Sequence, residues 1–231
     1  MLAAAAVDRD PDRTSAPSRA GSRPYALRVG HLDAGDAVLV AVEAHLLTVL
    51  GEDSGRAGVT FLGVERIDLL RFGPSADGLI RYVTLGMSRA PMSDSTVTVV
   101  DPAAPRAELV LELRGYVDTV LRRLAVLAAS PAVEGVVVAP DALLDLGEPL
   151  WDEALFPAVL VGEPSTVPDL PLGEPSGVVR FLPVVPVTAE EAAFARVHGA
   201  AELRRQWALA GTDLTDSSRR GVLLRRPDAL G

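Results

Sequence analysis

The stretch GVVRFLPVVPVTAEEAAFARVHG, residues 177–199, contains the clearest change from one secondary structure to another in this chain. Its apolar, β-branched first half predicts a strand over residues 176–187. Pro183 and Pro186 lack the N–H that a sheet ladder needs, so we expect this strand to lie at an edge of the sheet or to end in a bulge. Thr188 followed by Glu191 forms a capping box, which predicts a helix that begins immediately after the strand. The stretch contains no recognisable catalytic signature.

Two further helices are predicted upstream of this stretch. Apolar residues recur at helical spacing over 36–50, and Gly51 supplies a plausible C-terminal stop. The same periodicity over 116–130 predicts a helix that ends before Pro131.

The remaining segments predict strands and a small C-terminal helix. Residues 59–73 and 78–92 are β-branched and aromatic segments interrupted by glycine, and residues 106–115 alternate as in a half-buried strand. A helix containing Leu203 and Trp207 is followed over 212–224 by an expected loop and final strand. The fold class predicted is α+β, with a mixed, mostly antiparallel sheet flanked by helices.

The composition excludes several kinds of chemistry. The chain has 231 residues, no cysteine and no lysine, and all 22 of its basic residues are arginine. Thiolate catalysis, cysteine-based metal centres, the P-loop lysine and Schiff-base chemistry are therefore excluded. No metal-ligand spacing is present, so we expect neither a metal nor a cofactor, and the absence of cysteine fits a cytoplasmic protein.

The charge of the chain indicates the kind of partner to expect. Formal net charge is −9, and the arginines are scattered, so direct nucleic-acid binding is disfavoured and a basic protein partner fits better. No segment resembles a signal peptide or a membrane span. Residues 1–24 have the composition of a disordered tail, which leaves residues 25–231 as one domain.

One sequence motif points to an enzyme. GMSRA, residues 86–90, half-matches the nucleophile elbow of serine hydrolases, with Ser88 as nucleophile but Ala90 in place of the last glycine. A hydrolase using Ser88 is therefore one alternative, and a turn hydroxyl is the other. Met87 and Met92 could equally form an adaptable contact surface or fill the core.

Three blocks taken together resemble the suppressor of fused (SUFU) family. RYVTLGMSRAPM (81–92) looks like its strand-and-turn segment, and AELVLELRG (107–115) with the following helix is similar to its acidic strand and helix. The third block, from Gly177 to Leu223, is similar to the closing segment of the family, with its Thr, paired acids and terminal Arg-Arg-Gly.

The resemblance implies a SUFU-like α+β domain of the bacterial stand-alone type, which is not an enzyme and acts by binding a protein partner. It further implies an immunity protein that neutralises a polymorphic toxin, and the negative charge of the chain indicates a basic toxin domain as its partner. The alternative is a regulator that grips an extended peptide of a transcription factor. Candidate partner-binding residues are Asp141, Leu127, Met87, Ser88 and Met92.

Overall fold

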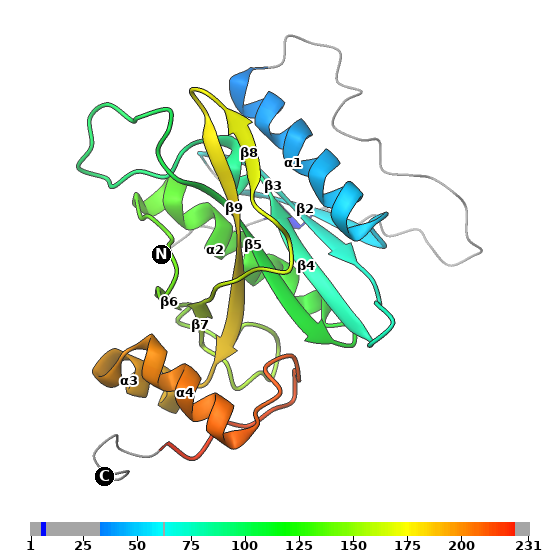
Figure 1. Cartoon of the computed structure of the whole chain (residues 1–231), viewed down its shortest axis with the longest axis vertical. Helices are drawn as coiled ribbons and strands as arrows, with labels where there is room; N and C mark the ends of the chain where they lie inside the picture. Colours follow the sequence, from blue (N-terminus) through cyan, green and yellow to red (C-terminus); the bar gives the residue numbers. More distant parts are fainter. Residues whose placement is uncertain (1–5, 8–32, 62, 225–231) are drawn as a thin grey trace.

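The computed structural model describes residues 6–7, 33–61 and 63–224, which form a mixed sheet of nine strands with helices on both faces (Figure 1). The strand order is β1-β2-β3-β4-β5-β9-β7-β6, and β8 pairs with β9 beside this path. Every pairing is antiparallel except that of β5 with β9. The predicted fold class is therefore confirmed. The elements are β1 (Ala6–Val7), α1 (Ala34–Leu50), β2 (Gly55–Phe61), β3 (Val64–Phe72), β4 (Leu79–Leu85), η2 (Met87–Arg89), β5 (Arg106–Arg114), η3 (Asp118–Val120), α2 (Leu121–Glu134), β6 (Leu143–Asp145), β7 (Ala158–Val161), β8 (Leu170–Gly173), β9 (Gly177–Val187), α3 (Ala189–His198) and α4 (Ala200–Ala210).

β9 joins the two halves of the sheet because it changes partners along its length. Residues 179–183 pair in parallel with β5, and residues 184–187 pair antiparallel with β7. β8 pairs with the first residues of β9 on the side opposite β5. The prediction that the prolines would keep this strand at an edge is wrong, since β9 lies in the middle of the sheet.

The two prolines are tolerated because each lies where β9 needs no ladder donor. Pro183 is the last residue opposite β5, and its carbonyl accepts the Gly162 amide at 2.7 Å. The Pro186 carbonyl accepts Arg219 Nη2 at 2.6 Å. The N–H and C=O of one residue point to the same side of a strand, so the position of the missing Pro186 N–H faces Arg219 instead of β7.

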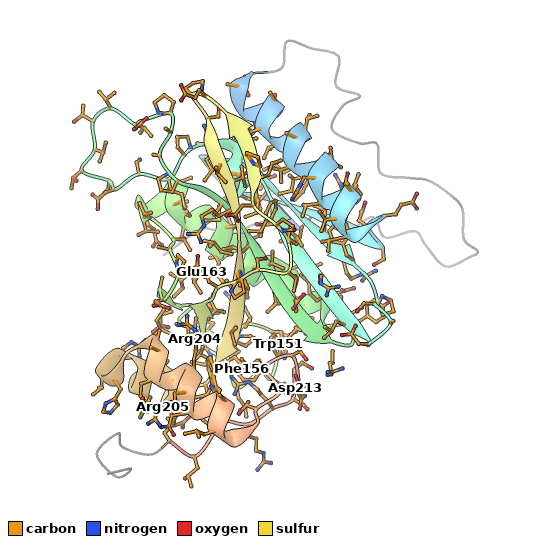
Figure 2. All side chains as sticks on the ribbon, in the orientation of Figure 1. Trp151, Phe156, Glu163, Arg204, Arg205 and Asp213 are labelled. Carbon is orange, nitrogen blue, oxygen red and sulfur yellow. The ribbon has the colours of Figure 1, made fainter. Side chains whose placement is uncertain are left out.

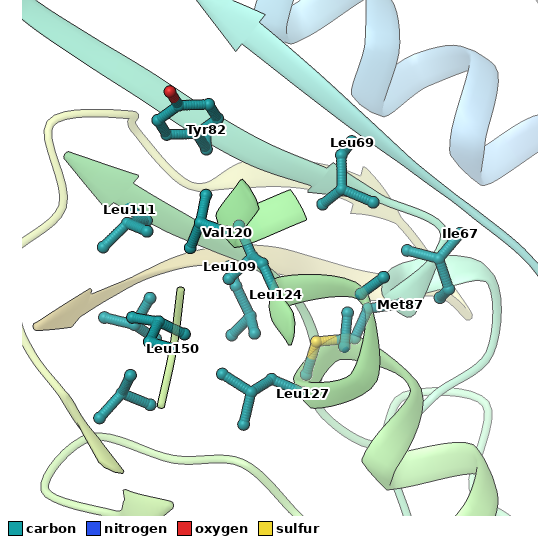
Figure 3. Close-up of a cluster of buried hydrophobic side chains, with 14 of the residues drawn as sticks. Ile67, Leu69, Tyr82, Met87, Leu109, Leu111, Val120, Leu124, Leu127 and Leu150 are labelled. Atoms are coloured by element: carbon teal, nitrogen blue, oxygen red, sulfur yellow. The ribbon is translucent and has the colours of Figure 1, made fainter. Parts of the chain in front are cut away.

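The sheet has a separate apolar core on each face. α1 covers one face and packs Leu39 and Leu46 against Phe72 of β3 and Phe181 of β9. α2 covers the other face, where its leucines lie among side chains of β3, β4 and β5 (Figure 3). Burying a leucine or phenylalanine stabilises the fold by about 1.5–3 kcal/mol each, so these two layers supply most of the favourable burial energy.

β5 is buried on both faces, which the alternating sequence did not predict. Seven of its nine residues are buried, including the charged Arg106 and Glu108. A central strand between two helical layers has no solvent face, and its polar residues therefore need internal partners. Thr84 and Ser88 supply such partners to Glu108.

α2 continues past Pro131 to Glu134, so the prediction that this proline ends the helix is wrong. Pro131 cannot donate to the carbonyl four residues before it, that of Leu127. The Ser130 hydroxyl donates to this carbonyl at 2.7 Å and replaces the lost bond. Gly135, in the left-handed conformation with φ of 64°, ends the helix.

A third apolar cluster, formed by α3, α4 and the end of the sheet, surrounds a buried ion pair. Thr188 caps α3 in the predicted capping box with Glu191, whose carboxylate is completely buried. The guanidinium of Arg219 lies over the rings of Phe156 and Trp207, and Figure 2 shows Phe156 close to α4. The donors to the Glu191 carboxylate are Thr188 N at 3.0 Å, Trp207 Nε1 at 2.9 Å, Arg219 Nη1 and Nη2 at 2.9 Å each, and Val222 N at 3.2 Å.

Residues 212–224 form turns and irregular structure, so the expected final strand is absent from this described segment. Asp213 accepts hydrogen bonds from the Thr215 amide and hydroxyl, and Asp216 accepts the corresponding bonds from Ser218. Hydrogen bonds from Thr215 and Arg114 lower the pKa of Asp213 to about 2. These carboxylates fix the turns that bring Arg219 to Glu191.

The predicted disordered tail, residues 1–24, lies outside the described residues except for Ala6 and Val7, which pair with β2 as β1. The assignment of residues 25–231 to one domain stays a prediction.

We expect Arg219→Met to lower the free energy of unfolding by about 3–5 kcal/mol, because it leaves the Glu191 carboxylate buried without its cation. Urea denaturation followed by far-UV circular dichroism measures this loss. Arg220→Met is the matched control, since Arg220 is the exposed neighbour of Arg219 and its loss should change stability by less than about 0.5 kcal/mol. Equal effects of the two substitutions would contradict the role given to Arg219.

The ion pair also predicts a pH dependence. Desolvation pushes the pKa of Glu191 up, but hydrogen bonds from Arg219, Thr188 and Trp207 outweigh it and hold the pKa below 4.5. A carboxyl whose pKa is lower in the folded state stabilises the fold above its unfolded pKa and loses this effect as pH falls through the folded value. The stability difference between the native chain and Glu191→Gln should therefore be constant near neutral pH and shrink below pH 4.5. Denaturation curves over this range provide the measurement, and a difference independent of pH would disprove the assignment.

Candidate functional site

A pocket of about 560 Å³ lies between the β2–β3 turn, η2 with the loop that follows it, and the end of α2. We call it the valine pocket. Residues from three separate segments line it, among them Glu65, Met87, Val97, Val100, Val133 and Glu134.

Two glycines allow these segments to approach one another. Gly86 precedes η2 with φ of 149°, and an added Cβ would lie 3.0 Å from the carbonyl oxygen of Arg66. A Cβ on Gly135 would lie 2.6 Å from that of Ser95, and the Ser95 amide donates to the Gly135 carbonyl at 3.1 Å. Gly135 therefore ends α2 and also holds the 91–105 loop against the helix.

Exposed apolar side chains lie on the segments that line the pocket and beside them in the sequence. Val99 is 82% exposed at the tip of the 91–105 loop, and four more valines are exposed on this loop and around the end of α2. Exposed apolar groups that gather beside a cavity mark surfaces for protein partners. The four other valines are Val97, Val100, Val133 and Val137.

The charges at the pocket are mainly acidic. Glu65, Asp94 and Glu134 line it, and within the described residues neither Glu65 nor Glu134 takes part in an ion pair. The only arginine in the lining, Arg89, pairs with Asp36 at the start of α1. The pocket therefore presents negative potential around an apolar centre.

Ser88 lies next to this pocket but is completely buried in a polar network around Glu108. The Ser88 hydroxyl donates to Glu108 Oε1 at 2.6 Å, and the amides of Gly86 and Ser88 donate to the same oxygen. Thr84 Oγ1 donates to the other carboxylate oxygen at 2.5 Å. Desolvation raises the pKa of Glu108, against these hydrogen bonds, which favour the charged form. The network fixes η2 to β5.

This arrangement does not resemble that of a serine nucleophile. Ser88 has no solvent-accessible surface, and its hydroxyl proton is directed to a carboxylate. His45 bonds to the Pro168 carbonyl at 2.8 Å, and the ring of His198 packs 4.4 Å from that of Phe194. His31 lies outside the described residues. The two histidines in the described residues, His45 and His198, therefore interact with groups other than Ser88.

The structure brings four of the five predicted site residues together. Met87 lines the valine pocket, and Met92 and Leu127 are buried in the α2-side core behind it, where Figure 3 shows Leu127 near Met87. Ser88 is buried beside them. Asp141 is separate: it is exposed, has φ of 69°, and pairs with Arg204 of α4.

The exposed valines of the pocket were not among the site residues predicted from the sequence. The run STVTVV, residues 95–100, has the composition of a strand, yet it forms an exposed loop between Asp94 and Asp101. The available sequence signal was this β-branched run between two aspartates. That the run is exposed could be learned only from the structure.

The described residues contain no group of three or more potential metal ligands. None of the helices in the described ranges is long and apolar enough to span a membrane.

Comparisons with known proteins agree on one family. A family model described as suppressor of fused protein (SUFU) matches residues 63–220. The structure is similar to that of a SUFU homologue from Neisseria gonorrhoeae FA 1090, with a TM-score of 0.60 and 19% identity over 80% of this chain and 97% of that one.

Two other solved structures are similar at lower identity. Drosophila Suppressor of Fused has a TM-score of 0.55 and 17% identity, over 80% of this chain and 50% of that one. The chain in a Sufu–Fu complex has a TM-score of 0.53 and 15% identity, over 80% of this chain and 90% of that one. No curated protein matches the sequence.

We expect Ser88→Ala to lower the free energy of unfolding by about 1.5–3 kcal/mol, because the buried Glu108 carboxylate loses one hydrogen-bond donor. Chemical denaturation measures the loss. Ser93→Ala is the control, since this residue lies in the loop that follows η2 and shows no hydrogen bond to the network. Unchanged stability together with a lost esterase activity would overturn this structural role.

Proposed function

The chain belongs to the suppressor of fused family, and we propose that it works by binding a protein partner at the valine pocket. The observation that carries this proposal is a cavity of about 560 Å³ that combines exposed valines with acids that have no ion-pair partner among the described residues. A structure similar to this one is that of a Sufu–Fu complex, in which a family member is bound to a protein.

The chemistry of the pocket fits a protein partner with an apolar anchor and basic neighbours. Apolar anchors in a pocket, surrounded by polar groups, provide most of the binding energy in protein interfaces. Val97, Val100 and Val133 supply the apolar wall, and Glu65 and Glu134 would meet basic groups at its rim. Met87 adds a flexible thioether to the wall, which adapts to side chains of different shape.

The finer proposal is that the partner is the basic toxin domain of a polymorphic toxin and that this chain is its immunity protein. The net charge of −9 would speed association with a cationic nuclease, and bound protein would occlude its nucleic-acid groove. Binding alone accounts for this activity, so the proposal requires no catalytic residue and no cofactor. It also places the chain in the cytoplasm, where such a toxin acts.

A second candidate function is the grip of an extended peptide beside Asp141. β6 follows Asp141 and pairs only with β7 in the described part of the sheet, so its other edge is open to a guest strand. This edge is short, and its last residue, Asp145, is bound to Arg196 of α3. The valine pocket combines a cavity with exposed apolar side chains and is therefore preferred.

The test compares three forms of the chain in affinity capture from the lysate of the native host. We expect the double variant Val97→Asp/Val99→Asp to lose the partner that the native chain captures. A lost apolar anchor weakens an interface by about 30-fold or more. Leu209→Asp is the control, because the exposure of Leu209 lies between those of Val97 and Val99, and it belongs to α4 and not to the pocket lining. Retention of the partner by the double variant would rule out the pocket as the binding site.

The identity of the captured partner then distinguishes an immunity protein from a regulator that binds a transcription factor. Co-production of a captured toxin with this chain should restore growth of a bacterial host, and the double variant should fail to do so. The variant Glu65→Arg/Glu134→Arg should reduce the association rate and its dependence on salt, because rim charges act mainly on encounter. A captured transcription factor whose binding depends on Asp141 would favour the second candidate function.

A further inference from the structure

We propose a second binding site on this chain: the outer edge of β2, which takes an extended segment of a partner protein as an added antiparallel strand. This inference is independent of the valine pocket and uses the opposite end of the sheet from β6. Four observations support it: a partly occupied strand edge, small residues along that edge, a cavity beside it and an exposed aromatic residue near the cavity.

The edge of β2 already accepts a strand. Ala6 and Val7 pair antiparallel with Thr60 and Val59. The outer edge of β2 can therefore accept an antiparallel strand. This contact covers two residues of a seven-residue strand. Among the described residues, none pairs with the outer side of Gly55–Gly58. A two-residue ladder is weak, so a longer strand can displace it.

The sequence after Val7 is poorly suited to extend this ladder. Antiparallel continuation of the register would place Asp8 opposite Gly58 and Pro11 opposite Gly55. Aspartate is depleted in strands, and proline cannot donate to a ladder. The unpaired half of the edge is therefore better matched by a foreign segment than by the residues of the chain that follow β1.

The open half of β2 is flat because its residues are small. Gly55, Ala57 and Gly58 present little side chain to an incoming strand. The guanidinium of Arg66 lies over Gly58, where an added Cβ would be 2.1 Å from its carbon atom. Arg56 is the one large residue of this half, and its guanidinium forms an ion pair with Glu43 of α1. An incoming backbone can therefore approach the edge closely.

A small cavity lies beside this edge and can receive a side chain of the added strand. It has a volume of about 190 Å³ and is lined by Gly55, Ala57 and Leu69 of the sheet and by Leu121 of α2. The side chain of a strand residue opposite Ala57 would point to this face of the sheet, as Ala57 does. The volume suits a valine, leucine or isoleucine.

The far wall of the cavity carries residue types that are frequent in binding hot spots. Arg71 lines it, pairs with Asp118 at 2.5 Å, and stacks 4.9 Å from the centre of the exposed Tyr116 ring. Tyrosine and arginine are enriched at the centres of protein interfaces. The charged residues that line the cavity, Arg56, Arg71 and Asp118, are all held in ion pairs. The occupant is therefore an uncharged, β-branched segment and not a basic one.

The test uses the full chain and a synthetic peptide of alternating threonine and valine, acetylated at one end and amidated at the other so that it carries no charge. We expect the peptide to slow hydrogen exchange of the amides of Gly55–Phe61 when present at about 1 mM, the effective concentration typical of a tethered segment. Ala6→Pro/Val7→Pro in the full chain removes the competing ladder donors. This variant should bind the peptide about three- to tenfold more tightly, because a larger share of the edge is free.

Three controls make the outcome decisive. A peptide methylated on alternate backbone nitrogens should not bind, since it cannot form the ladder, and Tyr116→Ala should weaken binding while Leu209→Ala does not. Val97→Asp/Val99→Asp should leave peptide binding unchanged, which separates this site from the valine pocket. Absence of protection in β2, or equal binding of the methylated peptide, would overturn the proposal.

Discussion

A single buried carboxylate, that of Glu191, ties together the parts of this fold that are far apart in sequence. It accepts hydrogen bonds from the start of α3, from α4 and from the C-terminal segment. A charge in this position is tolerated only with such complete pairing, since burial of an unpaired ion costs several kcal/mol. Arg219 extends the constraint to β9 through the Pro186 carbonyl. The end of the sheet, two helices and the last turns are therefore fixed by one group.

Local elements of this fold could be predicted from the sequence, whereas their partners could not. The capping box of Thr188 and Glu191 was evident from spacing alone, because it involves residues one turn apart. The position of β9 was misjudged because prolines are usually excluded from central strands. What allows them here, the change from β5 to β7 and the contact with Arg219, depends on residues distant in sequence.

The same distinction applies to the candidate site. Met87 and Leu127 are candidates from the sequence, and they do lie in one cluster, but as core side chains of which Met87 lines the valine pocket. Its exposed part is built from the β2–β3 turn, the 91–105 loop and the end of α2. The close contacts of Gly86 with Arg66 and of Gly135 with Ser95 bring these segments together. No periodicity within one segment reports such a contact, so the pocket required the structure.

The parallel pairing of β5 with β9 has a consequence for synthesis of the chain on the ribosome. More than sixty residues separate these strands, so β5 emerges long before its neighbour. During this interval the edge of β5 that pairs with β9 in the folded chain has no partner strand. Contacts between segments remote in sequence form slowly. Arg219 emerges later still. The nascent chain therefore passes through a stage in which β2 to β5 are present but β9 has not yet been synthesised. Chaperones that bind exposed strands would act at this stage.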